Sequence, residues 1–263
     1  MHLGKAIRME RIMNRNNGRT IVVPLDHGVT VGPIYGLIDL RDTVNQVAEG
    51  GANAMLMHKG IPRCSHRAGG KDIGLIIHLS ASTSLSPYPN AKTMVGSVSD
   101  AIKLGADAVS IHVNLGDATE TQMLSDFGAL CSEASEWGMP VLAMVYARGP
   151  KITDEYAPEV VAHCARVGVE LGADIVKVNY TGSPESFATV VNGCCVPVVI
   201  AGGPRLESER DLVQMVYDSI QAGGSGLSVG RNIFQHPHPA KIVAALNKVV
   251  HEDWEVDAAM ELL

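Results

Sequence analysis

The chain has 263 residues, a formal net charge of −7, 46% hydrophobic residues and only 4% aromatic residues. The acidic balance argues against a nucleic-acid partner, which needs a basic face, and no apolar run approaches the roughly 18 residues of a membrane span. The low aromatic content requires an aliphatic core, and the length fits one large domain, so we expect a single domain spanning residues 1–263.

The N-terminus and the cysteines indicate a cytoplasmic protein. Residues 1–10 form a charged amphipathic stretch without the apolar centre of a signal peptide. The five cysteines are odd in number and include the vicinal pair Cys194 and Cys195, which does not normally form a structural disulfide. The pair precedes a buried strand, so we favour packing over a redox role.

Eight segments have the pattern of buried strands, and helical patterns lie between most of them. We expect a short helix at residues 5–15, then strands at residues 20–28, 51–60, 73–80, 105–114, 139–146, 172–180, 196–203 and 224–231. Helix starts occur at Pro158, Ser183 and Ser208. Eight βα units in this length predict an α/β fold, a (β/α)8 TIM barrel with a short N-terminal helix. A doubly wound open sheet is the alternative, but no G-x-G-x-x-G follows the first strand.

The strand at residues 172–180 carries one lysine, Lys177, in its apolar middle. Burial disfavours the ammonium form, so the pKa of Lys177 should be lowered. A neutral lysine is a nucleophile toward a carbonyl carbon. Alternation along the strand places Ile175 and Asn179 on the same face. The alternative is a lysine whose head reaches water past the strand end.

Polar residues and glycines gather where the predicted strands end. They are Asp26, His27, His58, Lys59, His78, His112, Tyr146, Arg148, Lys177, Gly202, Gly203, Gly230 and Arg231. The carboxyl ends of barrel strands meet at one rim, which carries the catalytic groups. The sequence therefore predicts an active site at this rim.

Carbon–carbon bond chemistry through an imine fits this set of residues. Lys177 can condense with a ketone, Tyr146 can transfer a proton at the hydroxyl that forms or breaks, and Asp26 can orient or deprotonate a hydroxyl. Taken alone, Asp26 is also a common helix-cap residue, and Tyr146 is also a core tyrosine with its hydroxyl at the rim.

The glycines at the ends of the last two strands predict a phosphate site. Gly202 and Gly203 end the seventh strand, and Gly230 ends the eighth, followed by Arg231. The loops after these strands form the usual phosphate site of such barrels. Glycines allow backbone N–H groups to approach an anion, and Arg231 can add a bidentate contact. Glycines also serve tight turns, which is the alternative.

Four histidines support a different hypothesis, a catalytic metal. His27, His58, His78 and His112 follow four successive strands, and three histidines suffice to bind a catalytic zinc. A metal-dependent aldolase or a metallohydrolase would fit them. No second carboxylate cluster accompanies these histidines, however, and Lys177 would have no function in such a site. We therefore expect no metal.

Several of these segments resemble the archaeal-type class I aldolases, the group that includes the deoxyribose-phosphate-aldolase-like barrels. The resemblance spans nearly the whole chain. It is carried by residues 23–28, 144–149, 174–179, and 198–203 together with 229–235. Residues 59–60, 74–81 and 110–114 resemble one branch in particular, which opens an alternative route to 3-dehydroquinate and the aromatic amino acids.

The resemblance implies a transaldolase without a cofactor, in which Lys177 forms the covalent imine, Tyr146 donates a proton and Asp26 accepts one. It implies that Lys177 attacks the methyl-side ketone of 6-deoxy-5-ketofructose 1-phosphate. Hydroxypyruvaldehyde phosphate then leaves, and the remaining enamine adds to L-aspartate semialdehyde. The implied substrate-binding residues are His27, Gly28, Val29, Thr30, Ala147, Arg148, Gly202, Gly203, Gly230 and Arg231.

The same resemblance implies the partners of the protein. They are a phosphorylated keto sugar and an aldehyde acceptor, without nucleic acid or membrane, in a homo-oligomer, because family members form large rings such as decamers. The acceptor has a carboxylate, and Lys59, Arg148 and Lys151 are the cations that we expect near it.

Three positions depart from the family or separate its branches. Ala147 replaces the usual proline, and Val178 replaces a frequent threonine but should face the helices. Met144 stands where the fructose-bisphosphate branch tends to have tryptophan. The alternatives are a class I fructose-bisphosphate aldolase, an aldolase joining dihydroxyacetone phosphate to aspartate semialdehyde, and a non-catalytic barrel that binds a sugar phosphate.

Overall fold

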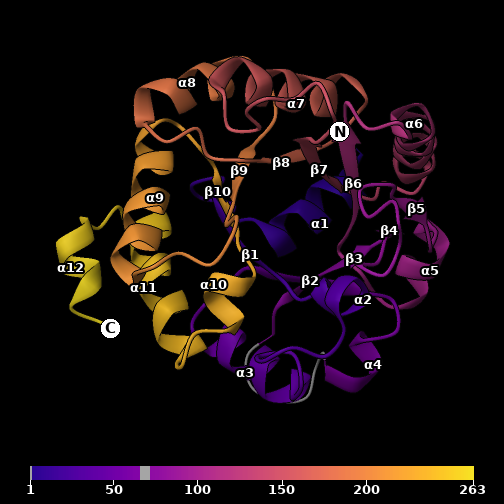
Figure 1. The fold of residues 1–263 in the computed structure, drawn as a ribbon. Coiled ribbons are helices and arrows are strands. Elements are labelled where there is room, and N and C mark those ends of the chain that lie inside the picture. Colours follow the sequence, from indigo (N-terminus) through magenta and orange to yellow (C-terminus); the bar gives the residue numbers. More distant parts are fainter. Residues whose placement is uncertain (1, 66–71) are drawn as a thin grey trace.

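The computed structural model describes residues 2–65 and 72–263, and its centre is a closed barrel of parallel strands inside a ring of helices (Figure 1). This confirms the predicted (β/α)8 fold. The barrel strands are β1 (Thr20–Pro24), β2 (Ala54–His58), β3 (Gly74–His78), β6 (Ala108–Leu115), β7 (Val141–Ala147), β8 (Ile175–Val178), β9 (Val198–Ala201) and β10 (Gly226–Ser228). Their order around the barrel is β1-β10-β9-β8-β7-β6-β3-β2.

Helices follow most strands and form the outer layer. They are α2 (His27–Val31), α3 (Leu40–Glu49), α4 (Pro62–Ser65), α5 (Val98–Lys103), α6 (Glu120–Glu136), α7 (Pro158–Glu170), α8 (Pro184–Asn192), α9 (Glu209–Gln221), α10 (Arg231–Phe234), α11 (Pro239–Glu252) and α12 (Val256–Met260). Ser183 and Ser208 cap α8 and α9 through their hydroxyls, as their sequence patterns predict. Within the described ranges, none of the helices combines the length and apolarity needed to cross a membrane.

Alternation along the strands divides the core into two layers. Leu142, Met144 and Tyr146 of β7 belong to the cluster inside the barrel, together with Ile175 of β8. Val178 belongs to the larger cluster between the strands and the helices. The structure thus confirms that Val178 faces the helices. Lys177 lies beside Met144 in the register of β7 and β8, so it points into the barrel.

A repeated Gly-Ala-Asp or Gly-Ala-Asn sequence joins helices to strands. Its glycine adopts a positive φ, 73° at Gly105 and 102° at Gly172, which a side chain would strain. Its polar residue then accepts a hydrogen bond from the amide that begins the neighbouring strand. Asp107 accepts from Leu75, and Asp174 accepts from Val141, both at 2.9 Å. The motif thus sets helix ends and strand positions together.

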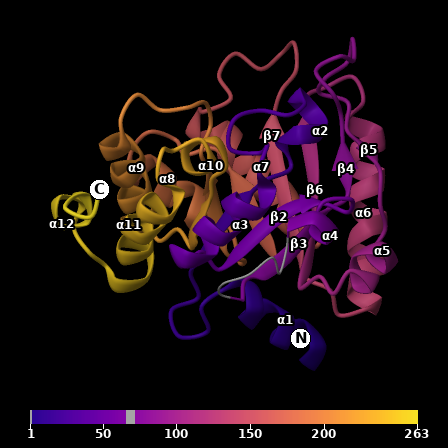
Figure 2. The same cartoon turned by 90° about the horizontal axis from the view of Figure 1, so that it is seen from below.

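The helix α1 (Leu3–Ile12) closes the amino end of the barrel, opposite α2 (Figure 2). Its Lys5 donates to both oxygens of Asp174 at 2.8 and 2.9 Å. Its Ile12 is fully buried in the inner cluster. The helix begins two residues before the predicted residues 5–15, and it ends three residues earlier because Met13 is already extended.

One insertion at the other end of the barrel escaped sequence analysis. After β3, the chain forms a small antiparallel pair, β4 (Ser80–Ala81) and β5 (Thr93–Met94). β4 packs on β6, so the segment between β4 and β5 lies above the β3–β6 side of the barrel. Strands of only two residues have no periodicity that a sequence pattern could reveal.

Candidate active site

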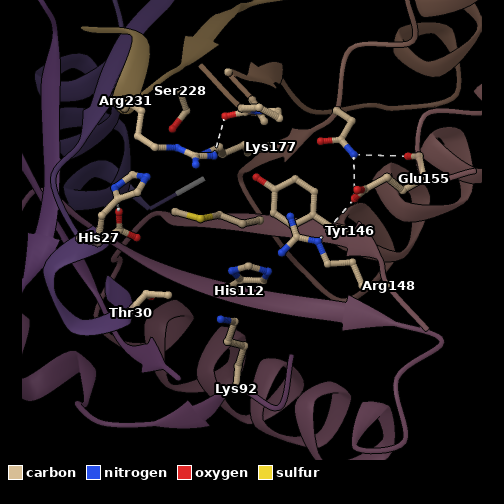
Figure 3. Close-up of a pocket in the computed structure, with 18 of the residues that line it drawn as sticks. His27, Thr30, Lys92, His112, Tyr146, Arg148, Glu155, Lys177, Ser228 and Arg231 are labelled. Carbon is tan, nitrogen blue, oxygen red and sulfur yellow. Dashed lines mark hydrogen bonds and ion pairs between the residues drawn. The ribbon is translucent and has the colours of Figure 1, made fainter. Parts of the chain in front are cut away.

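A cavity of about 360 Å³ opens at the carboxyl end of the barrel (Figure 3). Its lining residues are Asp26, His27, Thr30, Val31, Lys92, His112, Met144, Tyr146, Arg148, Glu155, Tyr156, Lys177, Asn179, Ala201, Gly202, Gly203, Pro204, Ser228, Gly230 and Arg231. The three residues with proposed catalytic roles all face it. The rim site predicted from the strand ends is therefore a real concavity.

Lys177 is 7% exposed and lines the cavity, so its ammonium is largely shielded from solvent. Burial lowers the pKa of Lys177 to about 8, the charge of Asp26 acts in the opposite direction, and the charge of Arg148 lowers the pKa further. A substantial fraction of Lys177 is then neutral and nucleophilic near neutral pH.

Asp26 stands between β1 and α2, and its carboxylate is directed to the cavity rather than to the helix. Asp26 is the N-cap residue of α2, but its side chain accepts no capping hydrogen bond. Its oxygens lie 3.2 Å from His27 Nδ1 and 4.0 Å from His78 Nε2. Burial acts to raise the pKa of Asp26, but the close approach of His27 and the charge of Lys177 act in the opposite direction, and the pKa of Asp26 is lowered. The carboxylate is ionised and available as a base.

Tyr146 lies between the barrel interior and the cavity. It is 6% exposed, its ring centroid is 5.1 Å from that of His112, and the Arg148 guanidinium carbon lies 4.8 Å from its centroid. Burial raises the pKa of Tyr146, although the charge of Arg148 lowers it. The phenol therefore keeps its proton and can donate it.

At the end of β9, Gly202 and Gly203 occupy positions that disfavour a larger residue. Gly203 has φ 59°, in the left-handed region, and a Cβ on Gly202 would lie 2.5 Å from Val229 Cγ1. Arg231 Nη2 donates to the Gly203 carbonyl at 2.8 Å. Ser228 Oγ is buried and, among the described residues, has no hydrogen-bond partner. This end of the cavity thus offers hydrogen-bond donors to the oxygens of a ligand.

Three residues of the predicted binding set do not line the cavity. Gly28 and Val29 lie on the exposed surface of α2. The side chain of Ala147 joins the outer core cluster, because it alternates with Tyr146. A contact between Ala147 and a substrate would have to come from its backbone.

The histidines do not converge. His58 packs on His78, with ring centroids 5.2 Å apart, His112 packs on Tyr146, and His27 packs on Phe234. Burial lowers the pKa of His78 to about 3 and holds that of His112 well below its usual range. In residues 2–65 and 72–263, no three His, Cys, Asp or Glu side chains are grouped as metal ligands. The metal hypothesis therefore has no ligand set in the described chain.

Sequence analysis missed two charged residues of the site, Lys92 and Glu155. Lys92 comes from the segment between β4 and β5, and Glu155 from the loop before α7. Of the cations expected near the acceptor, only Arg148 lines the cavity: Lys59 donates to Asp100 at 3.1 Å, and Lys151 is exposed outside the lining. Both missed residues lie in loops, where no pattern marks their direction.

A parallel barrel with a buried lysine of lowered pKa, a carboxylate and a neutral phenol around one cavity is the arrangement of aldolases that form a Schiff base. The chain belongs to the DeoC/LacD family of aldolases, whose family model matches residues 20–236.

Curated relatives match almost the full length. The 2-amino-3,7-dideoxy-D-threo-hept-6-ulosonate synthase of Halobacterium salinarum is 42% identical over 98% of this chain and 95% of its own. A synthase of the same name from Archaeoglobus fulgidus is 45% identical over the same shares. The 2-amino-4,5-dihydroxy-6-oxo-7-(phosphonooxy)heptanoate synthase of Streptomyces griseus is 39% identical over 97% of this chain and 93% of its own.

One similar solved structure contains a covalent intermediate on its catalytic lysine. An archaeal fructose-1,6-bisphosphate aldolase, with its catalytic lysine covalently bound to the carbinolamine intermediate of the substrate, superimposes with a TM-score of 0.85 and 30% identity. The match covers 94% of this chain and 99% of the other. The structural neighbours thus include class I aldolases, as the family assignment requires.

Proposed function

We propose that this protein is a class I transaldolase that moves a three-carbon ketol unit from 6-deoxy-5-ketofructose 1-phosphate to L-aspartate semialdehyde. Its product is then 2-amino-3,7-dideoxy-D-threo-hept-6-ulosonate, the compound for which two relatives above 40% identity are named. The observation that carries the proposal is Lys177, buried in the cavity wall with a lowered pKa.

The first half-reaction cleaves the donor. Neutral Lys177 attacks the ketone next to the methyl group, and water leaves to form an iminium. Asp26 accepts the proton of the hydroxyl on the far side of the scissile bond. That bond breaks, its electron pair moves into the iminium to give an enamine, and hydroxypyruvaldehyde phosphate leaves.

The second half-reaction makes the new bond. The enamine carbon attacks the aldehyde carbon of aspartate semialdehyde, and Tyr146 gives its proton to the oxygen that becomes a hydroxyl. Water then hydrolyses the iminium, which releases the product and restores Lys177, and the proton that Asp26 accepted passes to Tyr146, so both residues return to their starting states. No external cofactor takes part, because the imine itself is the electron sink.

The test is a covalent adduct. Incubation with the donor and borohydride should reduce the imine and add the mass of the ketol unit or of the whole donor to Lys177. Lys177→Met should abolish the adduct. Loss of activity on treatment with EDTA, together with an absence of borohydride trapping, would replace this proposal with a metal-dependent mechanism.

A second donor is favoured by a specific observation. The hydrogen-bond donors at Gly202, Gly203, Ser228 and Arg231 suit a phosphate, and the product named for the Streptomyces relative keeps a phosphonooxy group. Dihydroxyacetone phosphate joined to aspartate semialdehyde would give such a product. Assays of each donor with each acceptor, read by product mass, separate these reactions from each other and from fructose-bisphosphate synthesis.

We further propose a single-domain, cytoplasmic homo-oligomer. The family membership and the continuous barrel support this, and sedimentation of the purified protein measures the subunit number. A monomeric mass would exclude the ring assemblies expected from the resemblance.

A further inference from the structure

The cavity has a second charged end, opposite the glycines. In the strand order of the barrel, β10 and β6 lie four positions apart, so they face each other. Lys92 directly precedes β5, above the β6 side. Figure 3 accordingly shows Lys92 across the cavity from Arg231, with the rings of Tyr146 and His112 between them. A ligand long enough to reach both ends therefore meets two separate sets of polar groups.

The Lys92 ammonium is half-buried and lacks an acidic partner. It donates to the Ser82 hydroxyl and, at 3.4 Å, to the Pro89 carbonyl. Within the described ranges, it forms no ion pair with a carboxylate. Burial and the nearby charge of Arg148 lower the pKa of Lys92, and the charge of Asp26 only partly offsets them. A partly buried cation that none of the described carboxylates contacts directly gains from an anionic ligand.

A carboxylate, Glu155, faces the same cavity. One of its oxygens lies 3.4 Å from both Arg148 Nε and Asn179 Nδ2, which is long for a hydrogen bond. The hydrogen bonds that Glu155 accepts from Arg148 and Asn179 are therefore weak. The Glu155 carboxylate can accept a further, closer hydrogen bond from a ligand cation.

We propose that Lys92 binds the carboxylate and Glu155 binds the α-ammonium of the aldehyde acceptor. The site would then recognise the amino acid head of aspartate semialdehyde. This inference rests on the proposed function, but not on the choice of donor, because both named products are 2-amino acids. An acceptor with a phosphate in place of the amino acid head fits less well. Lys92 could bind one negative charge of the phosphate, but Glu155 would repel the other.

Three acceptors test the two contacts separately. Succinate semialdehyde lacks the amino group of aspartate semialdehyde, and 3-aminopropanal lacks its carboxylate. Each loss should lower the wild-type kcat/KM by roughly ten- to hundredfold, the usual effect of one charge-assisted hydrogen bond.

The variants should remove these preferences one at a time. Lys92→Met should lower kcat/KM for aspartate semialdehyde and succinate semialdehyde, which have the carboxylate, and leave that for 3-aminopropanal unchanged. Glu155→Gln should lower kcat/KM for aspartate semialdehyde and 3-aminopropanal, which have the amino group, and leave that for succinate semialdehyde unchanged. Lys92→Arg should restore most of the preference. Lys59→Met is the matched control, because its ammonium is held by Asp100 outside the cavity lining.

Two failures are distinguishable. If wild-type protein forms no borohydride adduct or accepts none of the three aldehydes, the proposed function falls and this inference with it. If wild-type protein uses aspartate semialdehyde, but Lys92→Met weakens all three acceptors equally, only the inference falls. Trapping of the donor on Lys177 should be equal in wild type and variants, which excludes a general loss of folding.

Discussion

The reactivity of Lys177 should depend on pH in a way that its two charged neighbours control in opposite directions. Its pKa is lowered from 10.5 to about 8. At pH 7 about 10% of the side chain is then neutral, against about 0.03% for an ordinary lysine, a difference of about 300-fold. This 300-fold increase in the neutral fraction is the gain available for the attack on the ketone, and it is the net result of burial and of the charges of Asp26 and Arg148.

Two substitutions separate the causes. Arg148→Met removes a positive charge that lowers the pKa of Lys177, so the pKa should rise and the neutral fraction at pH 7 should fall. Asp26→Asn removes a negative charge that raises the pKa, so the pKa should fall. Because burial is the largest cause, both variants should stay well below the ordinary value.

The assay does not depend on catalysis. The rate of acetylation of Lys177 by acetic anhydride, read from peptide masses between pH 6 and pH 11, reports the neutral fraction. The exposed Lys241 serves as the reference for the reagent in each sample. A wild-type midpoint above pH 10, or a shift of both variants in the same direction, would refute the reasoning.

Three further predictions concern single contacts. Tyr146→Phe keeps the ring and removes the proton, so borohydride trapping should persist while turnover falls by roughly 10²–10⁴-fold; unchanged turnover would make Tyr146 a core residue only. Lys177→Met should stabilise the fold by about 3 kcal/mol at pH 7, because the pKa of Lys177 is lower in the folded state than in the unfolded chain. The penalty is complete below pH 8 and disappears toward pH 10.5, so melting curves of the two proteins should converge over that window; a constant gap would point to packing instead. Asp174→Ala leaves both the Val141 amide and the Lys5 ammonium without their acceptor. It should therefore lower the free energy of unfolding, measured with denaturant, by about 2–4 kcal/mol, and by clearly more than Lys5→Met does.

Much of the architecture could be read from the chain because its signals are local and periodic. The apolar runs and the Gly-Ala-Asp repeats marked all eight barrel strands, since a buried strand needs β-branched residues and a helix end needs a glycine with positive φ. Alternation along β8 also determined that Lys177 and Ile175 share one face, because side chains of a strand change face at every residue, and the structure shows that this face is the inner one.

Only the tertiary structure decided what surrounds those side chains. The pKa of Lys177 depends on burial and on the positions of Asp26 and Arg148, which reach the cavity from β1 and β7, far from Lys177 in the sequence. The failure of the four histidines to converge likewise follows from rotamers and packing partners, which no spacing encodes.

The directions of loop side chains are the feature that the sequence predicted least well. Lys92 and Glu155 lie in segments without periodicity; Lys92 donates to the Ser82 hydroxyl, and Glu155 lies near Arg148 and Asn179. The sequence instead pointed to Lys59, which stands at a strand end but turns to Asp100 on α5. A strand fixes the direction of its side chains through its own geometry, whereas a long loop side chain follows the nearest partner, and that partner is known only once the chain has folded.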